Sequence, residues 1–354
     1  MKNTLTYSQQ INQQNILKLR ELRSELPKFL STYFTGIDHI LASRTKIAYA
    51  TDLKTFFEYI KHANPIYHNI EIRDFNLDCL ESMTFTDMNE YMEYLKLYKS
   101  AEGKIVENNE RAIKRKMASV RSMYNFFHKS EKINVNPAAQ VDMPRLHDKA
   151  IIRLDINEVS SLLDAVESGD TLSDTQQRFH KKNKLRDLAI LTLMLGTGIR
   201  VSECVGLDLI DIDFNNDRIK VVRKGGYEAF VYFGDEVREA LEAYLEEREL
   251  VENIVEGHEN ALFLSSRKRR ITVRSVEILV KKYARTVTTM KNITPHKLRS
   301  TYGTALYQQT GDIYLVADVL GHKDVNTTRK HYAAIEEERR KMAKDKVILR
   351  KEKE

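Results

Sequence analysis

Thr294-Pro295-His296-Lys297-Leu298-Arg299 stands near the C-terminal end of the chain, and these residues identify the start of a helix. Thr294 can cap a helix with its hydroxyl, and Pro295 suits the first helical position, so we predict that a helix begins here. His296 and Arg299 are then three residues apart on that helix, which directs both side chains to the same side.

A second motif, Leu320-Gly321-His322, follows at the end of an apolar stripe over residues 315–320. The stripe predicts another helix, and Gly321 predicts its end, because glycine readily takes the left-handed conformation that closes a helix. His322 is therefore expected at a helix exit rather than in a core. Tyr332, the last tyrosine in the chain, lies further downstream.

Together, these residue types suggest phosphoryl transfer on a phosphodiester. Arginine offers a planar fork of donors to the oxygens on which charge develops. Histidine can donate to the same oxygens or move a proton near neutral pH, and a tyrosine hydroxyl can attack the phosphate and hold it covalently. Taken alone, each piece is more often an ordinary surface feature, so the hypothesis depends on what the rest of the chain supplies.

Two further elements lie upstream. The segment Thr197-Gly198-Ile199-Arg200-Val201-Ser202-Glu203 places a second arginine just after a glycine-bounded turn. Residues 218–222 and 228–233 are β-like and flank Gly225-Gly226, which predicts a hairpin with Lys224 at its tip. A lysine beside a turn is usually just solvated, and only the spacing of Lys224 from Arg200 favours a functional role.

With these motifs in order, the chain resembles the tyrosine recombinase (phage integrase) family, and within it the Xer-type and conjugative-transposon branches, from about Pro27 to Tyr332. The resemblance implies a mostly α fold with a small β-sheet: an N-terminal helical-bundle (SAM-like) core-binding domain, followed by an α+β catalytic domain. It also implies that the catalytic set falls on Arg200, Lys224, His296, Arg299, His322 and Tyr332.

Some positions depart from the family pattern. Arg223 stands where the family usually has glycine, so Lys220, although in mid-strand, stays open as a substitute for Lys224. The family's commonest spacing would place the nucleophile at His331, but the next residue, Tyr332, fits a spacing that the family also uses. We keep Tyr332 as the predicted nucleophile because it is the only tyrosine beyond the second histidine motif.

The resemblance implies a site-specific recombinase or integrase that cuts and rejoins DNA strands through a 3′-phosphotyrosyl intermediate and a four-way junction, without metal, ATP or other cofactor. Its partner is double-stranded DNA with a specific recombination site, on which four copies assemble across two duplexes. An accessory protein or a second recombinase is a further candidate partner. Two alternatives stay open: a catalytically silent DNA-binding regulator of the same fold, and an enzyme that relaxes DNA like a type IB topoisomerase.

Length and composition are compatible with this hypothesis. The 354 residues suffice for two domains, and the net charge of +6 fits a polyanionic partner only weakly, given 57 basic and 51 acidic residues. Cys79 and Cys204 are far apart in sequence, which argues against a disulfide framework or a zinc site and for a reducing cytoplasm. No apolar run is long enough for a membrane span, and no phosphate-binding glycine loop occurs. We therefore expect a cytoplasmic protein without membrane contact or cofactor.

The chain is expected to divide at its prolines and polar segments. A helical pattern from Ile16 to Leu26 precedes Pro27, and the segment 28–132 is helical throughout. A proline-containing, irregular segment follows, as is typical of a domain boundary. The predicted parts are an N-terminal extension (1–26), a helical domain (27–133), a linker (134–152), the catalytic domain (153–334) and a C-terminal helix (335–354). The resemblance implies that the helical domain is the core-binding domain that clamps DNA and that the C-terminal helix docks on a neighbouring protomer.

Within the catalytic domain, Asp155-Ile156-Asn157-Glu158 is a capping box that predicts the start of the first helix. Glu167 to Asn183 is polar and is expected to form a loop. The next segment, 185–195, is apolar almost all round, which predicts a buried helix that gives Arg200 a rigid base.

One helix of the N-terminal domain is strongly basic and supplies candidates for DNA contact. This helix, predicted to begin after Asn108-Asn109, carries no acidic residue between Glu110 and Glu131. A solvated basic face is the alternative interpretation, and the resemblance favours phosphate contact, with Lys116 mattering less than Lys114 and Arg115. The predicted DNA-binding residues are Arg44, Thr45, Arg111, Lys114, Arg115 and Arg121.

Overall fold

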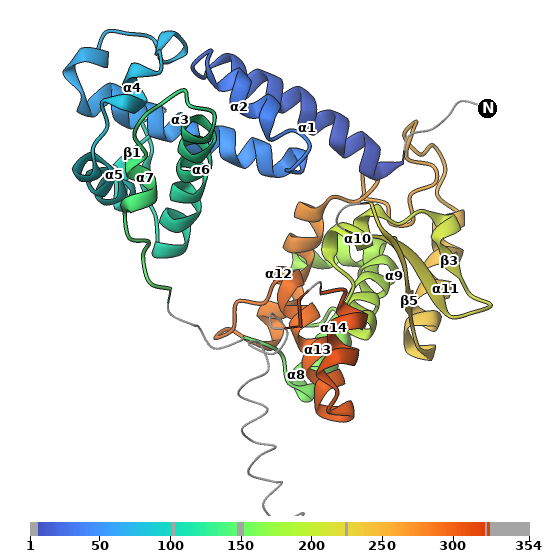
Figure 1. Cartoon of the computed structure of the whole chain (residues 1–354). Coiled ribbons are helices and arrows are strands. Elements are labelled where there is room, and N and C mark those ends of the chain that lie inside the picture. Colours follow the sequence, from blue (N-terminus) through green and yellow to red (C-terminus); the bar gives the residue numbers. More distant parts are fainter. Residues whose placement is uncertain (1–5, 101–102, 147–151, 224–225, 323, 326–354) are drawn as a thin grey trace, which may run out of the picture. The chain divides into compact units, whose positions relative to one another are not determined.

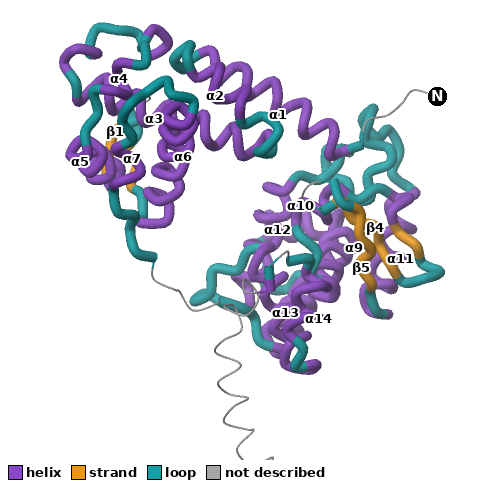
Figure 2. The backbone as a smooth tube through the Cα atoms, viewed as in Figure 1, coloured by secondary structure: helices purple, strands orange, loops and turns teal. Residues whose placement is uncertain are grey.

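The chain forms two compact units, residues 1–149 and 150–354 (Figure 1). The computed structural model describes residues 6–100, 103–146, 152–223, 226–322, 324 and 325. Helices dominate both units, and the strands of the described ranges form two small antiparallel sheets (Figure 2). The expected fold class, mostly α with a small β-sheet, is confirmed. None of the helices in these ranges is both long and apolar enough to cross a membrane.

The first unit is a helical bundle with an aromatic core. Its helices are α1 (Tyr7–Ser24), α2 (Leu30–Gly36), α3 (Ser43–Ala63), α4 (Asp78–Glu81), α5 (Phe85–Lys96), α6 (Glu110–Lys129) and α7 (Pro137–Gln140), with 3₁₀ turns at Pro65–Tyr67 and Ile72–Asp74. Phe56 of α3 and Tyr91 of α5 are fully buried and meet edge to face, with ring centroids 5.0 Å apart. Such pairs contribute beyond the apolar area that they bury, so they join α3 firmly to α5.

The helix α1 begins earlier than the helical pattern from Ile16 indicates. Thr6 and Gln9 form a capping box, in which each side chain accepts a hydrogen bond from the other residue's backbone N–H. This box starts the helix at Tyr7. Leu19 is buried in the core of the first unit, where α1 packs along α3. Residues 7–24 therefore belong to the packing of this unit.

A short hairpin interrupts the helices of the first unit. The prediction that residues 28–132 are helical throughout is wrong here, because β1 (Leu97–Lys99) and β2 (Ile105–Glu107) pair antiparallel. Gly103, at φ +81°, donates its N–H to the carbonyl oxygen of Ser100 at 2.8 Å. Glycine supplies the left-handed turn, and the flanking β-branched and aromatic side chains favour strands over helix.

The second unit combines helices with a three-stranded sheet. In chain order its elements are α8 (Ile156–Ser168), α9 (Asp174–Thr197), α10 (Val201–Gly206), a 3₁₀ turn (Leu209–Asp211), β3 (Ile212–Asp213), β4 (Arg218–Val222), β5 (Glu228–Tyr232), α11 (Asp235–Glu249), α12 (Val273–Val287), α13 (Pro295–Thr310) and α14 (Ile313–Leu320). The helices α8, α11 and α13 pack against α9. The strand order is β3-β4-β5, and the buried Ile219 lies opposite the buried Val231 in the predicted β4–β5 hairpin.

The helix α9 is longer than predicted. The expected loop from Glu167 to Asn183 is wrong for most of its length, because only residues 169–173 separate α8 from α9. The side chain of Gln176 accepts a hydrogen bond from the Ser173 N–H at 3.1 Å, which helps to start the helix. The polar residues that follow continue as helical turns into the apolar segment.

A buried polar network explains why these polar turns stay helical. His180 Nδ1 lies 3.0 Å from the hydroxyl of Tyr283, and this hydroxyl donates to Asp187 Oδ2 at 3.0 Å. Lys282 Nζ donates to the same carboxylate oxygen at 3.2 Å. Because buried polar groups need partners, the network fastens α9 to α12. Burial raises the pKa of Tyr283 and lowers the pKa of His180.

The helix ends that border the sequence motifs of the second unit follow the local sequence. Thr294 is the N-cap of α13 and Pro295 its first residue, although the Thr294 hydroxyl makes no capping hydrogen bond. The helix α14 ends at Gly321 in the left-handed conformation, as predicted. The capping box of Asp155 and Glu158 is also present and starts α8.

Candidate active site

The turn between α9 and α10 places Arg200 at the beginning of α10. Gly198 is left-handed (φ +63°), and a Cβ there would lie 2.4 Å from Cδ1 of Tyr302, so both backbone and packing require glycine. Glu203 then holds Arg200 twice. Its Oε2 accepts the Arg200 backbone N–H at 3.0 Å, and its Oε1 accepts Nη1 at 2.7 Å. Because Glu203 is buried, Arg200 is held by a carboxylate in a fixed position.

Arg299, on α13, ties this turn to the end of α14. Only 5% of its surface is exposed. Its Nη1 donates to the carbonyl oxygen of Gly198 at 2.6 Å, and its Nη2 donates to the carbonyl oxygen of Leu320. His296 lies one turn nearer the start of the same helix and is exposed. Arg299 thus links three segments, the α9–α10 turn, α13 and the end of α14.

The end of α14 brings the two arginines together. Arg200 Nη2 donates to the carbonyl oxygen of Gly321 at 3.0 Å, and Arg299 donates to that of the preceding residue, Leu320. The two guanidiniums therefore lie beside consecutive peptide oxygens. Cations are favourable at a helix C-terminus, where the last carbonyl groups carry partial negative charge.

His322 leaves this helix end in a defined direction. Its backbone N–H donates to the carbonyl oxygen of Ala317 at 2.9 Å, and the N–H of Gly321 donates to that of Asp318 at 2.7 Å. These two bonds are the Schellman pattern of helix termination. His322 is half-buried. The structure therefore brings His322 next to the carbonyl groups that Arg200 and Arg299 bind.

A third guanidinium at this helix end was missed by sequence reasoning. Arg223 Nη2 donates to the carbonyl oxygen of Val319 at 3.1 Å, and its Nη1 donates to that of Asp318 at 3.4 Å. No local pattern signals a contact between residues so far apart in the chain. Glu203 is likewise absent from the predicted catalytic set, although its position three residues after Arg200 is the spacing of a capping box.

The remaining catalytic candidates belong to the hairpin segment and to the C-terminal part of the sequence. Three predictions lie outside the described residues: Lys224, Tyr332 and the C-terminal helix over 335–354. The alternative lysine is described. Lys220 Nζ lies 3.7 Å from Glu228 Oε1 and 3.9 Å from Asp211 Oδ1. Glu228 lies on β5 and Asp211 in the 3₁₀ turn before β3, so Lys220 already has ionic partners and Lys224 remains the predicted catalytic lysine.

Four of the predicted DNA-binding residues lie in the first turns of two helices in the first unit. Arg44 is exposed and Thr45 half-buried at the start of α3. Arg111 and Lys114 are exposed in the first turns of α6. Since exposed basic side chains can reach a phosphate without losing an internal partner, these positions remain predictions for DNA contact.

Two further residues of that set make contacts within the first unit. Arg115 donates to Asp52, a buried carboxylate, while 52% of its side chain stays exposed. Arg121 donates to the carbonyl oxygens of Ala138, at 2.7 Å, and Val141. For Arg121 the structure thus shows a role that the prediction did not include, because its guanidinium fastens α7 to α6.

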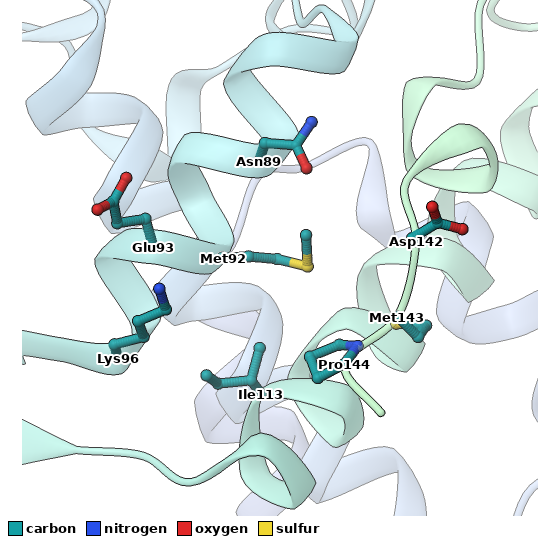
Figure 3. A pocket seen from close by; sticks show the side chains of 8 residues that line it. All are labelled: Asn89, Met92, Glu93, Lys96, Ile113, Asp142, Met143 and Pro144. Carbon is teal, nitrogen blue, oxygen red and sulfur yellow. The ribbon is translucent and has the colours of Figure 1, made fainter. Parts of the chain in front are cut away.

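The first unit also contains a hollow of about 380 Å³ between α5, α6 and residues 142–144 (Figure 3). Asn89 and Met92 extend from α5 toward that segment. Its lining mixes apolar side chains with scattered single charges and pairs no nucleophile with a base. Across the described parts of the chain, no three His, Cys, Asp or Glu side chains are grouped so that they could hold a metal ion.

Neither cysteine is a candidate nucleophile. Cys79 and Cys204 are both buried, and burial raises the pKa of each thiol to about 12. A thiol reacts as its thiolate, so both side chains act as small apolar groups. The arginine cluster at the end of α14 therefore carries the strongest chemistry among the described residues.

Known proteins resemble the chain over most of its length. The sequence profile of the phage integrase family matches residues 153–339. Tyrosine recombinase XerC of Caldanaerobacter subterraneus subsp. tengcongensis is 33% identical over 313 residues, which cover 86% of this chain and 81% of the relative. Tyrosine recombinase XerC of Staphylococcus carnosus is 28% identical over 310 residues, with coverages of 88% and 93%.

Solved structures share the fold at lower sequence identity. The Tn1549 transposon integrase in complex with circular intermediate DNA has a TM-score of 0.61 and is 20% identical, covering 85% of this chain and 93% of that chain. The XerH site-specific recombinase bound to its difH substrate in a pre-cleavage complex has a TM-score of 0.61 and is 19% identical, with coverages of 94% and 87%.

Proposed function

This chain belongs to the phage integrase family, and we propose that its reaction proceeds through a covalent bond between Tyr332 and the phosphate at the 3′ end of a cut DNA strand. As a member of this family it is a site-specific tyrosine recombinase, an enzyme that transfers DNA strands. A silent DNA-binding regulator and a topoisomerase are not favoured, because the similar proteins named above are recombinases and integrases.

The observation that supports this chemistry most directly is the meeting of two guanidiniums at the end of α14. Arg200 donates to the carbonyl oxygen of Gly321 and Arg299 to that of Leu320, so two positive charges lie beside adjacent oxygens. A phosphate presents its oxygens to forked donors in a similar way. We assign Arg200 and Arg299 to the non-bridging oxygens of the scissile phosphate, where they stabilise the five-coordinate transition state.

In cleavage, the hydroxyl oxygen of Tyr332 attacks the phosphorus in line with the bond to the 5′ oxygen. The new O–P bond forms as the P–O5′ bond breaks, which leaves a 3′-phosphotyrosine and a 5′-hydroxyl. Lys224 gives the departing 5′ oxygen its proton, and His296 and His322 hydrogen-bond the phosphate and take up the phenol proton. Because one phosphodiester replaces another, rejoining needs no nucleotide hydrolysis.

Double-stranded DNA is the substrate in this proposal. Its phosphates are assigned to the exposed basic side chains Arg44, Arg111 and Lys114. Four copies on two duplexes exchange strands through a four-way junction, with residues 335–354 reaching a neighbouring copy. An accessory protein or a second recombinase is a further proposed partner. Support for the DNA partner comes from the two solved structures named above, both of which are complexes with DNA.

The test is a trapped covalent complex. Protein–DNA junctions isolated from cells identify the target sequence. In a duplex of that sequence with a nick just beyond the cleavage site, the short fragment that carries the new 5′-hydroxyl diffuses away, so the covalent complex cannot rejoin. The wild-type protein should give a DNA-linked band on a denaturing gel. Tyr332→Phe should give none while it binds the duplex normally, because only the attacking oxygen is lost.

Tyr314→Phe is the matched control, since Tyr314 lies on α14 with 72% of its surface exposed. This variant should form the covalent band at the wild-type level. A covalent band from Tyr332→Phe would assign the attack to another residue.

A further inference from the structure

Arg223 links the β4–β5 hairpin to the end of α14. It directly follows β4, and its two terminal nitrogens donate to the carbonyl oxygens of Val319 (3.1 Å) and Asp318 (3.4 Å). Its Nε is inaccessible to solvent and has no hydrogen-bond partner within the described residues. Burying this N–H without a partner costs free energy, and the two hydrogen bonds of the terminal nitrogens offset that cost.

The backbone of the same residue closes the hairpin turn. The Arg223 N–H donates to the carbonyl oxygen of Tyr227 at 2.7 Å, and the Gly226 N–H donates to the carbonyl oxygen of Arg223 at 3.1 Å. The peptide groups of Arg223 therefore set the base of the turn while its side chain binds a helix end. One residue therefore contacts both the turn and the helix end.

Gly321 provides the space that this contact needs. A Cβ at Gly321 would lie 2.0 Å from Nη1 and 2.4 Å from Cζ of Arg223, and the residue has a left-handed φ of +60°. The absence of a side chain thus serves both the helix end and the guanidinium packed against it. The arginine and the glycine form one interlocking contact.

The chemistry of the contact suits arginine and not lysine. Two donors of one planar group reach two successive carbonyl oxygens, whereas an ammonium is a single point charge on a flexible stem. The same helix turn already accepts from Arg200 at Gly321 and from Arg299 at Leu320. Arg223 therefore connects the hairpin to the carbonyl groups that organise the two phosphate-binding arginines.

We propose that Arg223 is a positioning residue for strand cleavage, which fastens the hairpin to the end of α14 and so holds the next residue in the chain, Lys224, in register with Arg200 and Arg299. The inference rests on the proposed function, in which Lys224 protonates the leaving 5′ oxygen. Arg223 itself touches neither the phosphate nor the leaving group in this role.

The experiment compares two substrates under single-turnover conditions. One is the ordinary nicked recombination site, and the other carries sulfur in place of the 5′-bridging oxygen, which leaves without protonation. Arg223→Ala should cleave the ordinary duplex slower by on the order of 10- to 100-fold, the penalty of a misplaced catalytic group. The sulfur substrate should largely restore its rate, as it should for Lys224→Ala. Affinity for the uncleaved duplex should stay within about 3-fold of wild type, since no phosphate contact is lost.

Three further variants separate positioning from simple stability. Arg223→Lys keeps the charge but should cleave as poorly as Arg223→Ala. The double variant Arg223→Ala/Lys224→Ala should be no slower than Lys224→Ala, because residues that act together are not additive. Arg218→Ala is the matched control, since Arg218 lies on β4 and pairs with Asp213 at 2.9 Å. It should cleave at the wild-type rate.

An Arg223→Ala rate that equals wild type, or an equal loss on both substrates from a folded variant, would overturn the proposal. If Arg223→Ala unfolds, Arg223→Gln takes its place, because glutamine retains most of the side-chain volume. The ratio of its cleavage rates on the sulfur and the ordinary substrate then tests the proposal in the same way. Absence of covalent complex from the wild-type protein would instead contradict the proposed function, so the two failures are distinguishable.

Discussion

The guanidinium of Arg200 donates a hydrogen bond of 3.0 Å to the carbonyl oxygen of Gly321. This contact joins the start of α10 to the end of α14. It depends on Glu203, which orients the arginine, and on the left-handed backbone of Gly321, which presents the oxygen. Each side of the contact can be changed separately.

Gly321→Ala is expected to cost about 1–2 kcal/mol of unfolding free energy from its left-handed backbone alone. It should cost more in total, because the added Cβ would meet the Arg223 guanidinium at 2.0 Å. Gly257→Ala is the control, since Gly257 has a φ of +83° and a Cβ added there would meet no atom within 4 Å. Denaturant unfolding measures both. Equal losses would show that Arg223 moves aside without cost.

Glu203→Gln should loosen Arg200 without changing the size of the side chain. A glutamine has one acceptor oxygen for the two donors that Glu203 now serves, and its NH₂ opposes the other donor. We expect a loss of about 1–3 kcal/mol in unfolding free energy and roughly 10-fold slower cleavage. Glu242→Gln is the control, because it weakens only an exposed ion pair with Arg238 (3.1 Å). It should change the unfolding free energy and the cleavage rate little. Identical behaviour of the two variants would mean that other contacts orient Arg200.

Lys114→Ala should reduce the salt dependence of DNA binding. Each lost phosphate contact lowers the slope of log K against log salt by about 0.9, with little effect on sequence preference. Lys116→Met removes the same charge, but Lys116 is buried against Asp52 at 3.5 Å and should leave the slope unchanged. Arg115→Ala should lower the slope by an intermediate amount, because the Arg115 guanidinium already pairs with Asp52. A wild-type slope for Lys114→Ala would assign α6 to a solvated surface.

The His180 network predicts lower stability in mild acid. Burial, followed by the charge of Lys282, lowers the pKa of His180 below its ordinary 6.5. As the pH falls below about 6.5, the unfolded chain binds a proton that the folded chain still excludes, so stability decreases. His180→Asn keeps a polar atom for Tyr283 and does not titrate. The difference in unfolding free energy between wild type and variant should therefore shrink from about pH 7.5 to about pH 5.5. A constant difference would exclude His180 as the source.

The helix limits around the site could be predicted because they depend on adjacent residues. Pro295 fits only the first turn of a helix, and Gly321 takes a backbone conformation that other residues resist. The ordered motifs likewise identified Arg200, His296, Arg299 and His322 as candidates, and the structure shows Arg200 and Arg299 meeting at one helix end. Lys224 and Tyr332 stay predictions from motif order.

Other features could not be read from local sequence because distant residues create them. The polar start of α9 is helical through a partner on α12, where His180 meets Tyr283. Arg121 looked like one more basic residue of α6, and only the folded chain reveals the carbonyl groups that it binds. In the sequence, Arg223 is only a departure from the family pattern. Its role becomes visible in the folded chain, where it donates to a carbonyl oxygen of α14, far along the sequence.

Three guanidiniums gathered in one place would repel one another in the absence of DNA. In this protein the last carbonyl groups of α14 act as a built-in counterion, since they present partial negative charge to Arg200, Arg223 and Arg299. The cluster is therefore assembled before a phosphate arrives and needs no dissolved anion to hold it together. In the proposed function, an incoming phosphodiester meets a set of charges that already exists, so we expect the reorganisation that accompanies cleavage to be small.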